Sequence, residues 1–251
     1  MTETRGDADF EYLPGRDRSL LLLCDHASAA VPGVLGDLGL QAQDRLRHIA
    51  WDPGAAAVTR LLAAQLDCPA FLHGWSRLVC DPNRDVDDPD LILAESDGTH
   101  VPGNEGVDPT ERRHRWQRYH QPYHRAITAH LDTVAAAGVA PLLFAVHTFT
   151  PVYGGQLRPW RAGVLWRVCE APSRRFLTLL RARGIEVEEN LPYSGEDRLG
   201  YTLEHHGTAR GLEHLLIEIR HDLVEAPDQQ QRWAAVLADA LTAFRAETAP
   251  A

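Results

Sequence analysis

The chain of 251 residues contains no lysine, so all 25 of its basic residues are arginine. Without lysine a protein cannot form a Schiff base, cannot anchor pyridoxal phosphate, and cannot supply the lysine of a Walker-type phosphate loop. No GxGxxG sequence follows a predicted strand either. These absences argue against nucleotide, dinucleotide and pyridoxal chemistry.

Cysteine is scarce as well. The four cysteines form no CxxC pair and show no spacing typical of a disulfide framework: Cys24, Cys68, Cys80 and Cys169. We therefore expect free buried thiols. The first nineteen residues contain no apolar run that would make a signal peptide, and no later run approaches the length that crosses a bilayer. We expect a cytoplasmic protein with no membrane partner.

Positive charge is in deficit, because 35 acidic residues face 25 arginines and the formal net charge is −10. This balance argues against a nucleic-acid partner. A hydrophobic content of 44% is ordinary for a globular protein, and no Gly/Ser-rich or Pro-rich linker divides the chain. We expect a polar lead-in over residues 1–17 and a single domain over residues 18–251.

Hydrophobic periodicity and turn residues predict alternating strands and helices. The expected strands cover residues 19–24, 70–73, 77–80, 141–147, 163–166 and 214–222. The expected helices cover residues 54–66, 110–137 with a kink at Pro122, 172–183, a short segment after the loop 190–200, and 228–247. This alternation is typical of an α/β sandwich.

Three of the apolar strands end in a group that can do chemistry. His26 follows the first of them, and His147 comes directly after a run of five apolar residues. Open α/β sheets keep their crevices at the carboxyl ends of strands, so both imidazoles should meet there. Neutral imidazole is a good ligand for Zn²⁺, and catalytic sites use three protein ligands. We predict that His26 and His147 bind Zn²⁺ or another divalent transition metal.

The third metal ligand is less clear from the residues. A glutamate three positions after His26 would be the usual choice, but Ala29 occupies that position. Asp52 and Asp25 remain, and we favour Asp52. Asp52 also stands at a predicted helix start, where capping the helix is an equally good explanation for it.

Glu218 lies inside an apolar strand, where burying a carboxylate is costly unless it is paired or used. Arg220 is two residues further on and therefore on the same face of the strand. One interpretation is a salt bridge between the two. The other makes both catalytic, with Glu218 as the general base that activates metal-bound water.

A set of polar residues is suited to binding a substrate anion. Arg84, in the sequence DPNR after an expected strand, can clamp a carboxylate through two parallel hydrogen bonds. The other candidates are Asn83, Arg77, Arg158, Arg161 and His206. His120 and His124 lie four residues apart, but Pro122 stands between them and no HExxH is present, so we expect solvated or capping roles for them.

Several segments together resemble the N-formylglutamate amidohydrolase family in order and spacing, over roughly residues 19–245. They are CDHAS, HIAWDPGAA, SRLVCDPNR, PGN, YHQPYH, VHTFTP, RPW, NLPYSG and LIEIRHDL. The resemblance implies a fold similar to zinc-dependent exopeptidases, a three-layer sandwich in which helices cover both faces of a twisted mixed sheet and one metal lies at the strand ends.

The resemblance also implies roles for individual residues. Asn83 and Arg84 look like the pair that holds a substrate carboxylate in zinc carboxypeptidases and aspartoacylases. His147 resembles the later zinc histidine of that group, and Glu218 resembles its catalytic glutamate. Ala29 departs from the HxxE pattern of the wider group, which leaves the remaining ligand open.

These observations predict a zinc-dependent amidohydrolase that removes an N-acyl group, N-formyl by resemblance, from an acidic amino acid such as glutamate. The resemblance places such an enzyme in histidine degradation. Its partner would be a small N-acyl amino acid. Two alternatives stay open: a metal-free hydrolase with Cys24 as nucleophile and His26 or His147 as base, and a binding module that has the crevice but no activity.

Overall fold

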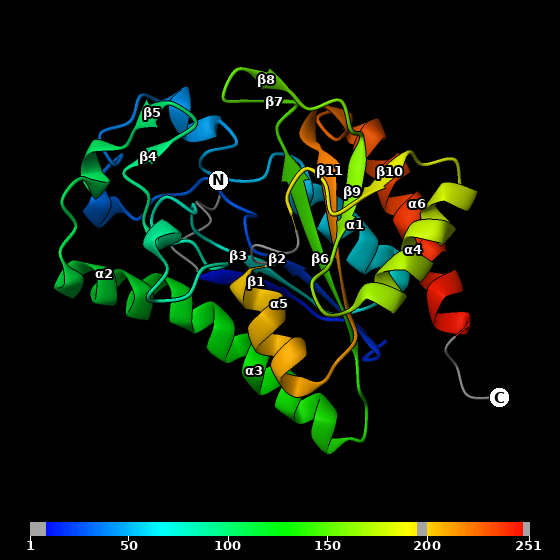
Figure 1. The fold of residues 1–251 in the computed structure, drawn as a ribbon. Coiled ribbons are helices and arrows are strands. Elements are labelled where there is room, and N and C mark those ends of the chain that lie inside the picture. The colour runs from blue at the N-terminus through cyan, green and yellow to red at the C-terminus, as the bar shows by residue number, and fades with distance from the viewer. Residues whose placement is uncertain (1–8, 195–199, 248–251) are drawn as a thin grey trace, which may run out of the picture.

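The computed structural model describes residues 9–194 and 200–247. Its centre is a seven-stranded mixed sheet with the order β1-β3-β2-β6-β11-β9-β10 (Figure 1). The strands are β1 (Phe10–Leu13), β2 (Leu20–Cys24), β3 (Ala70–His73), β6 (Leu142–Phe149), β9 (Ala162–Leu165), β10 (Val187–Glu189) and β11 (His214–Arg220). Neighbouring strands are parallel except at the pairs β1–β3 and β11–β9.

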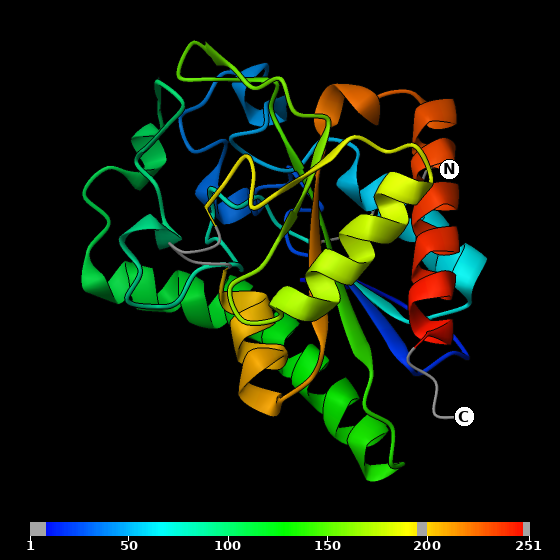
Figure 2. The same cartoon turned by 45° about the vertical axis from the view of Figure 1, so that its right-hand side comes forward.

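Helices cover both faces of this sheet (Figures 1 and 2). One face is covered by α1 (Ala55–Leu66), α4 (Glu170–Ala182) and α6 (Pro227–Ala246), and the other by α3 (Gln121–Ala136) and α5 (Tyr201–His206). Successive side chains of a strand point to opposite faces. Leu20 and Leu22 accordingly pack in the first core, and Leu21 and Leu23 in the second. The predicted three-layer α/β sandwich with a mixed sheet is confirmed.

The central strands bring the predicted chemical groups to one place. Strands β2, β6 and β11 are adjacent and parallel, so their carboxyl ends share one edge of the sheet. Glu218 on β11 stands directly opposite His147 on β6. His147 does not follow its strand, as the sequence suggested, because β6 continues to Phe149 by pairing with the end of β11.

Two short hairpins lie beyond this edge. They are β4–β5 (Glu95–Ser96 with Thr99–His100) and β7–β8 (Val152–Tyr153 with Gln156–Leu157). The hairpins touch, because the backbone N–H of Gly154 donates to Oδ1 of Asp97 at 2.8 Å. The second hairpin follows β6 directly, which places it next to the catalytic candidates (Figure 1).

Three local expectations need correction. Phe10–Leu13, within the expected polar lead-in, forms the edge strand β1 and pairs with β3. Residues 77–80 form no strand; the chain turns there because Ser76 accepts a backbone hydrogen bond from Val79. The long helix does not simply kink at Pro122. It begins as α2 (Pro109–Arg115), passes through a π-helical turn (Trp116–His120) and continues as α3.

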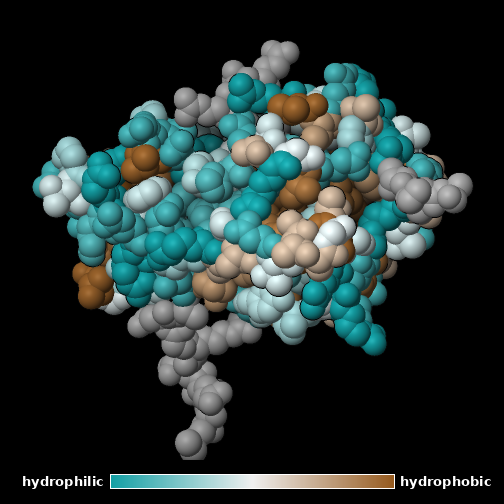
Figure 3. Space-filling model, turned by 90° about the horizontal axis from the view of Figure 1, so that it is seen from below, coloured by the Kyte–Doolittle hydropathy of each residue, from teal (hydrophilic) through white to brown (hydrophobic). Residues whose placement is uncertain are grey.

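One face of the molecule is shown by the hydropathy of its residues in Figure 3. Seen from below, the molecule is mostly hydrophilic, with a smaller hydrophobic area near the middle of that face (Figure 3). Such exposure is ordinary for a globular protein. Within the described residues, no helix combines the length and apolar character needed to cross a bilayer.

Candidate active site

One ring nitrogen of His26 makes a hydrogen bond and the other makes none within the described residues. Its Nε2 lies 2.8 Å from Oδ1 of Asp81. Burial acts to raise the pKa of Asp81, but His26, Arg84 and Arg77 outweigh it and lower the pKa, so Asp81 is an acceptor and Nε2 donates. The buried Nδ1 has no hydrogen-bond partner. Burial also lowers the pKa of His26 to about 4, which leaves the ring neutral at pH 7.

His147 lies beside His26, with a distance of 5.1 Å between the ring centroids. Its Nδ1 is 3.0 Å from Oδ2 of Asp52, and the Nδ1 of His26 is 3.4 Å from the same oxygen. Both Nδ1 atoms therefore converge on one carboxylate oxygen. The other nitrogen of His147, Nε2, lies 3.4 Å from Oδ2 of Asp25.

The two aspartates left open by the sequence have different positions. Asp25 is buried, and its Oδ1 accepts hydrogen bonds from the hydroxyls of Tyr123 at 3.0 Å and Thr202 at 2.9 Å. Its Oδ2 lies beside Nε2 of His147, the ring nitrogen that does not contact Asp52. Asp52 does not cap a helix with its side chain, since α1 begins only at Ala55 with Gly54 as N-cap. Its carboxylate is thus available to the histidines.

His26, Asp52 and His147 together could hold a metal ion. Their ligand atoms lie within 4.8 Å of one another, and all three residues are buried. The donor set of two imidazoles and a carboxylate suits a borderline cation such as Zn²⁺. The open Nδ1 of His26 fits as well, because a metal-binding histidine usually donates its second N–H to a carboxylate, as Nε2 does here to Asp81.

Charge in the cluster also matches a cation. Asp25, Asp52, Asp81 and Glu218 are all buried around the two rings. Burial alone would lower the pKa of His147, but Asp25 and Glu218 outweigh it and raise the pKa. A place that stabilises an imidazolium among carboxylates is also a place that stabilises a divalent metal.

Glu218 is a buried carboxylate that forms no ion pair within the described residues. It is buried, and burial raises its pKa although the charges of His147 and Arg77 act to lower it. Its Oε2 has no hydrogen-bond partner. Its neighbours in the sheet are His147 and Gly163. A buried carboxylate with an open oxygen beside a metal-binding group can take up a proton from substrate or water.

The hydrogen bonds of Arg220 go to groups other than Glu218. Arg220 donates to both carboxylate oxygens of Asp222, at 2.8 and 3.2 Å, and to backbone carbonyls of residues 158–160. No contact between Arg220 and Glu218 exists in the described structure. Arg77 instead forms an ion pair with Oδ1 of Asp52, and its charge acts on the pKa of Glu218. The ion pair places Arg77 beside the group of His26, Asp52 and His147.

The DPNR segment lies next to the cluster because its first residue, Asp81, hydrogen-bonds both to His26 and to the backbone of the segment. The Oδ1 of Asp81 that accepts from His26 also accepts from the backbone N–H of Asn83 at 2.8 Å. The Oδ1 of Asn83 accepts from the backbone N–H of Thr202 at 3.1 Å, and its amide NH₂ donates to no other described residue. In the described structure the Arg84 guanidinium contacts only a backbone carbonyl, 3.4 Å away.

His120 and His124, for which the sequence suggested solvated or capping roles, are buried and contact backbone carbonyls of the DPNR segment. His120 Nε2 lies 2.9 Å from the carbonyl of Arg84, and His124 Nε2 lies 2.8 Å from the carbonyl of Pro82. His206, expected to reach the substrate, is instead 2.9 Å from Nδ1 of His124. The signal available in the sequence was the pair His120 and His124 on one predicted helix face.

Two further candidates lie apart from the cluster. Arg161 is exposed, and its Nε is 3.8 Å from a carboxylate oxygen of Glu186, so the structure does not bring it to the substrate. Cys24 is fully buried in the core under α1, α4 and α6, and burial raises the pKa of its thiol to about 12. A thiol nucleophile must be accessible and ionised, so this environment disfavours the cysteine mechanism.

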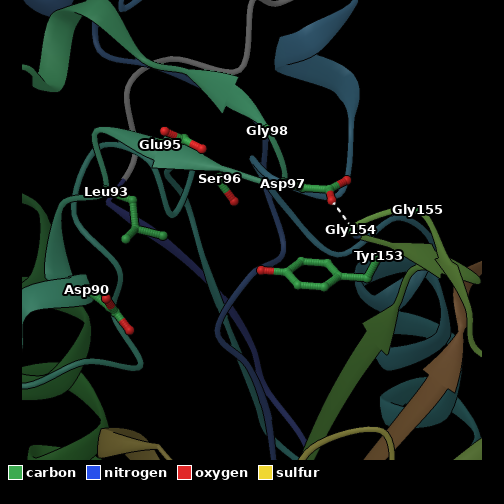
Figure 4. A pocket seen from close by; sticks show the side chains of 9 residues that line it. All are labelled: Asp90, Leu93, Glu95, Ser96, Asp97, Gly98, Tyr153, Gly154 and Gly155. Atoms are coloured by element: carbon green, nitrogen blue, oxygen red, sulfur yellow. Dashed lines mark hydrogen bonds between the residues drawn. The ribbon is translucent and has the colours of Figure 1, made fainter.

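A pocket of about 750 Å³ lies between the two hairpins (Figure 4). Its lining comes from residues 90–98 and 153–155, and it includes Asp90, Glu95, Asp97 and Tyr153. Among the described residues, only the cluster of His26, Asp52 and His147 groups three side chains suited to a metal. The lining of this pocket includes none of these three residues.

Comparisons with known proteins agree with this arrangement. The solved structure of a gene product from Agrobacterium tumefaciens is similar over 96% of both chains, with 32% identity and a TM-score of 0.92. N-formylglutamate amidohydrolase from Ralstonia eutropha JMP134 is similar in fold, with 19% identity, a TM-score of 0.69, and coverage of 96% of this chain and 100% of that one. Comparison with the curated proteins gave no match.

The family model described as N-formylglutamate amidohydrolase matches residues 18–225. This span contains every residue of the cluster, from His26 to Glu218, and the DPNR segment beside it. The chain therefore belongs to the N-formylglutamate amidohydrolase family.

Proposed function

We propose that this protein is a metal-dependent amidohydrolase that cleaves the N-formyl or another N-acyl amide of an acidic amino acid such as N-formylglutamate. The observation that carries the proposal is Glu218: a buried carboxylate with an open oxygen, directly opposite His147 and beside the group of His26, Asp52 and His147. Family membership supports the reaction class.

The metal would be held by His26, His147 and Asp52. When bound, it would polarise the substrate carbonyl and make an attacking water more acidic. Zinc is the best match to this donor set, although cobalt, iron or manganese also accept it.

Glu218 takes the proton of the attacking water through its open Oε2 and delivers it to the nitrogen of the leaving amino acid. Burial favours this role because it raises the pKa and so makes the carboxylate a stronger base. We assign the stabilisation of negative charge on the substrate oxygen to Arg77, in place of Arg220. Asn83 and Arg84 hold the α-carboxylate of the substrate, since both keep free donors.

The proposal is tested by metal analysis followed by a panel of N-formyl and N-acetyl amino acids. We expect about one tightly bound divalent metal per chain, cleavage of N-formylglutamate into formate and glutamate, loss of activity with a chelator and recovery with Zn²⁺. A metal-loaded protein that cleaves nothing in the panel would favour the binding module. Activity that survives the chelator but not thiol alkylation would favour Cys24.

A further inference from the structure

Arg158 has a setting that the reaction proposed above does not yet use. Its guanidinium carbon lies 4.6 Å from the ring centre of Tyr153 and 4.9 Å from that of Tyr193. Its Nη1 donates to the hydroxyl of Tyr193 at 3.2 Å. In the part of the chain that the structure describes, Arg158 forms no ion pair with a carboxylate. It is a cation between two aromatic rings with capacity left for an anion.

Hydrogen bonds fix the backbone on both sides of Arg158. Its N–H donates to the carbonyl of Pro151 at 2.7 Å, which closes the base of the β7–β8 hairpin. Its own carbonyl and the next two accept from Nη1 of Arg220 at 3.0 to 3.4 Å. Arg220 lies two residues after Glu218 on β11. The predicted catalytic arginine thus fixes the segment that carries Arg158 to the strand that carries Glu218.

Tyr193 is brought to the same place by Gly163. Gly163 stands opposite Glu218 in the sheet, and a Cβ at this position would lie only 1.7 Å from the carbonyl oxygen of Leu191. The segment before Tyr193 can pack against the strand only because residue 163 has no side chain. The segment that leads to Tyr193 therefore packs at the strand position opposite Glu218, and the charge of Arg158 acts to lower the pKa of that carboxylate.

The arginines of this region differ in whether they already pair with a carboxylate of the protein. Arg77 is paired with Asp52, and Arg161 faces Glu186. Arg84, whose charge acts on Asp81, and Arg158, whose charge acts on Glu218, form no ion pair with a carboxylate in the described structure. An N-acyl amino acid with an acidic side chain also carries two anionic groups.

We propose that Arg158 is a specificity residue that binds the side-chain carboxylate of the substrate, while Arg84 binds the α-carboxylate. This inference rests on the proposed amidohydrolase function and identifies the substrate class as N-acyl dicarboxylic amino acids. Tyr153 and Tyr193 flank the guanidinium, and the N–H groups that do not donate to Tyr193 would bind the substrate carboxylate.

The test compares Arg158→Gln with the wild-type protein on three substrates: N-formylglutamate, N-formylglutamine, which lacks only the side-chain charge, and the α-amide of N-formylglutamate. A charge-assisted hydrogen bond lost from a binding site lowers kcat/KM on the order of 10²-fold. We expect this loss for N-formylglutamate and for the α-amide, and little change for N-formylglutamine. The ratio between substrates cancels any effect of Arg158 on the base.

Arg161→Gln is the matched control, because it removes an equal charge three residues further along at an exposed site. It should leave all three rates unchanged. Equal losses of Arg158→Gln on N-formylglutamate and N-formylglutamine would overturn the proposal. Loss confined to substrates with a free α-carboxylate would overturn the assignment of the two carboxylates.

Binding of glutarate, a dicarboxylate with no amide to cleave, separates this inference from the proposed function. Calorimetry should show glutarate binding to the wild-type protein and weaker binding, on the order of 10²-fold, to Arg158→Gln. If the wild-type protein binds glutarate through Arg158 but hydrolyses no N-acyl amino acid, the function fails and the inference stands. Equal glutarate affinity of the two proteins would refute the inference while leaving hydrolysis of neutral substrates possible.

Discussion

Asp81 joins His26 to the substrate-binding segment through a single oxygen. Its Oδ1 accepts from Nε2 of His26 at 2.8 Å and from the backbone N–H of Asn83 at 2.8 Å. The orientation of His26, a proposed metal ligand, and the position of the proposed carboxylate clamp at Asn83 and Arg84 therefore depend on the same buried side chain. The DPNR segment begins at Asp81, directly after the buried residues Leu78 to Cys80.

Asp81→Asn tests this link. The amide oxygen can still accept both hydrogen bonds, but the negative charge that polarises His26 is lost. Partners of this kind change metal affinity by about 10–100-fold, so we expect weaker metal binding of that order. Competition with a metal indicator measures it. Unchanged affinity would show that Asp81 only shapes the loop, and Asp88→Asn, at another buried aspartate, is the control.

His124→Leu should disturb the clamp and leave the metal in place. His124 donates from Nε2 to the carbonyl of Pro82, so its Nδ1 accepts from Nε2 of His206. Leucine leaves both groups buried without a partner, at a cost of about 1–3 kcal/mol each. We expect a lower melting temperature and a higher KM with a smaller change in kcat.

His124→Gln serves as the rescue, because a glutamine amide can still donate to the carbonyl of Pro82. It should restore KM more fully than stability. His114→Leu, at an exposed histidine of α2, is the matched control. A kcat loss with normal KM in His124→Leu would contradict the clamp role.

Arg84→Lys keeps the positive charge but loses the two-pronged geometry of the guanidinium. If Arg84 binds the α-carboxylate, KM for N-formylglutamate should rise by about 10-fold, the worth of a good hydrogen bond. The α-amide of the substrate should be affected much less. Steady-state kinetics on both compounds decide it, since equal losses would mean that Arg84 acts on the loop and not on the carboxylate.

The sequence predicted the parts of this site that depend on strand ends. Buried apolar runs identify inner strands, and adjacent parallel strands must bring the groups at their carboxyl ends together, so His26, His147 and Glu218 could be placed from the pattern alone. The choice of Asp52 over Asp25 was favoured but not decided. It depends on where α1 begins, and helix ends are among the least certain features of a sequence.

Other features depend on contacts between residues far apart in the chain. β1 is a short edge strand whose partner β3 lies some sixty residues away, so its local pattern is weak. Arg220 was expected beside Glu218 because both lie on one strand face. In the structure its guanidinium instead donates to Asp222 and to three backbone carbonyls. Arg161 was one of several similar arginines, and only the fold shows that it lies beside Glu186 while Arg158 lies between two tyrosine rings.

Cys24→Ala separates the cysteine mechanism from the metal mechanism. The thiol is fully buried in the core on the side of α1, and burial raises its pKa to about 12, so almost none is ionised at pH 8. We expect wild-type kcat, a modest loss of stability from the missing sulfur, and no alkylation of Cys24 in the folded protein. Mass spectrometry after iodoacetamide treatment, with and without denaturant, reports the accessibility. A dead but folded Cys24→Ala variant would reverse the preference.

Glu218→Gln is the sharpest test of the mechanism. The amide keeps the shape of the side chain but cannot accept a proton, and general acid–base catalysis contributes about 10²–10⁴-fold, so kcat should fall by at least that order. Metal content and glutarate binding should persist. Because burial raises the pKa of Glu218, its charged form is the one that burial disfavours, and the neutral amide should leave the melting temperature equal or higher. Glu188→Gln, an exposed glutamate of β10, is the control for the change of charge. A Glu218→Gln variant that melts early yet turns over near the wild-type rate would remove Glu218 from the mechanism.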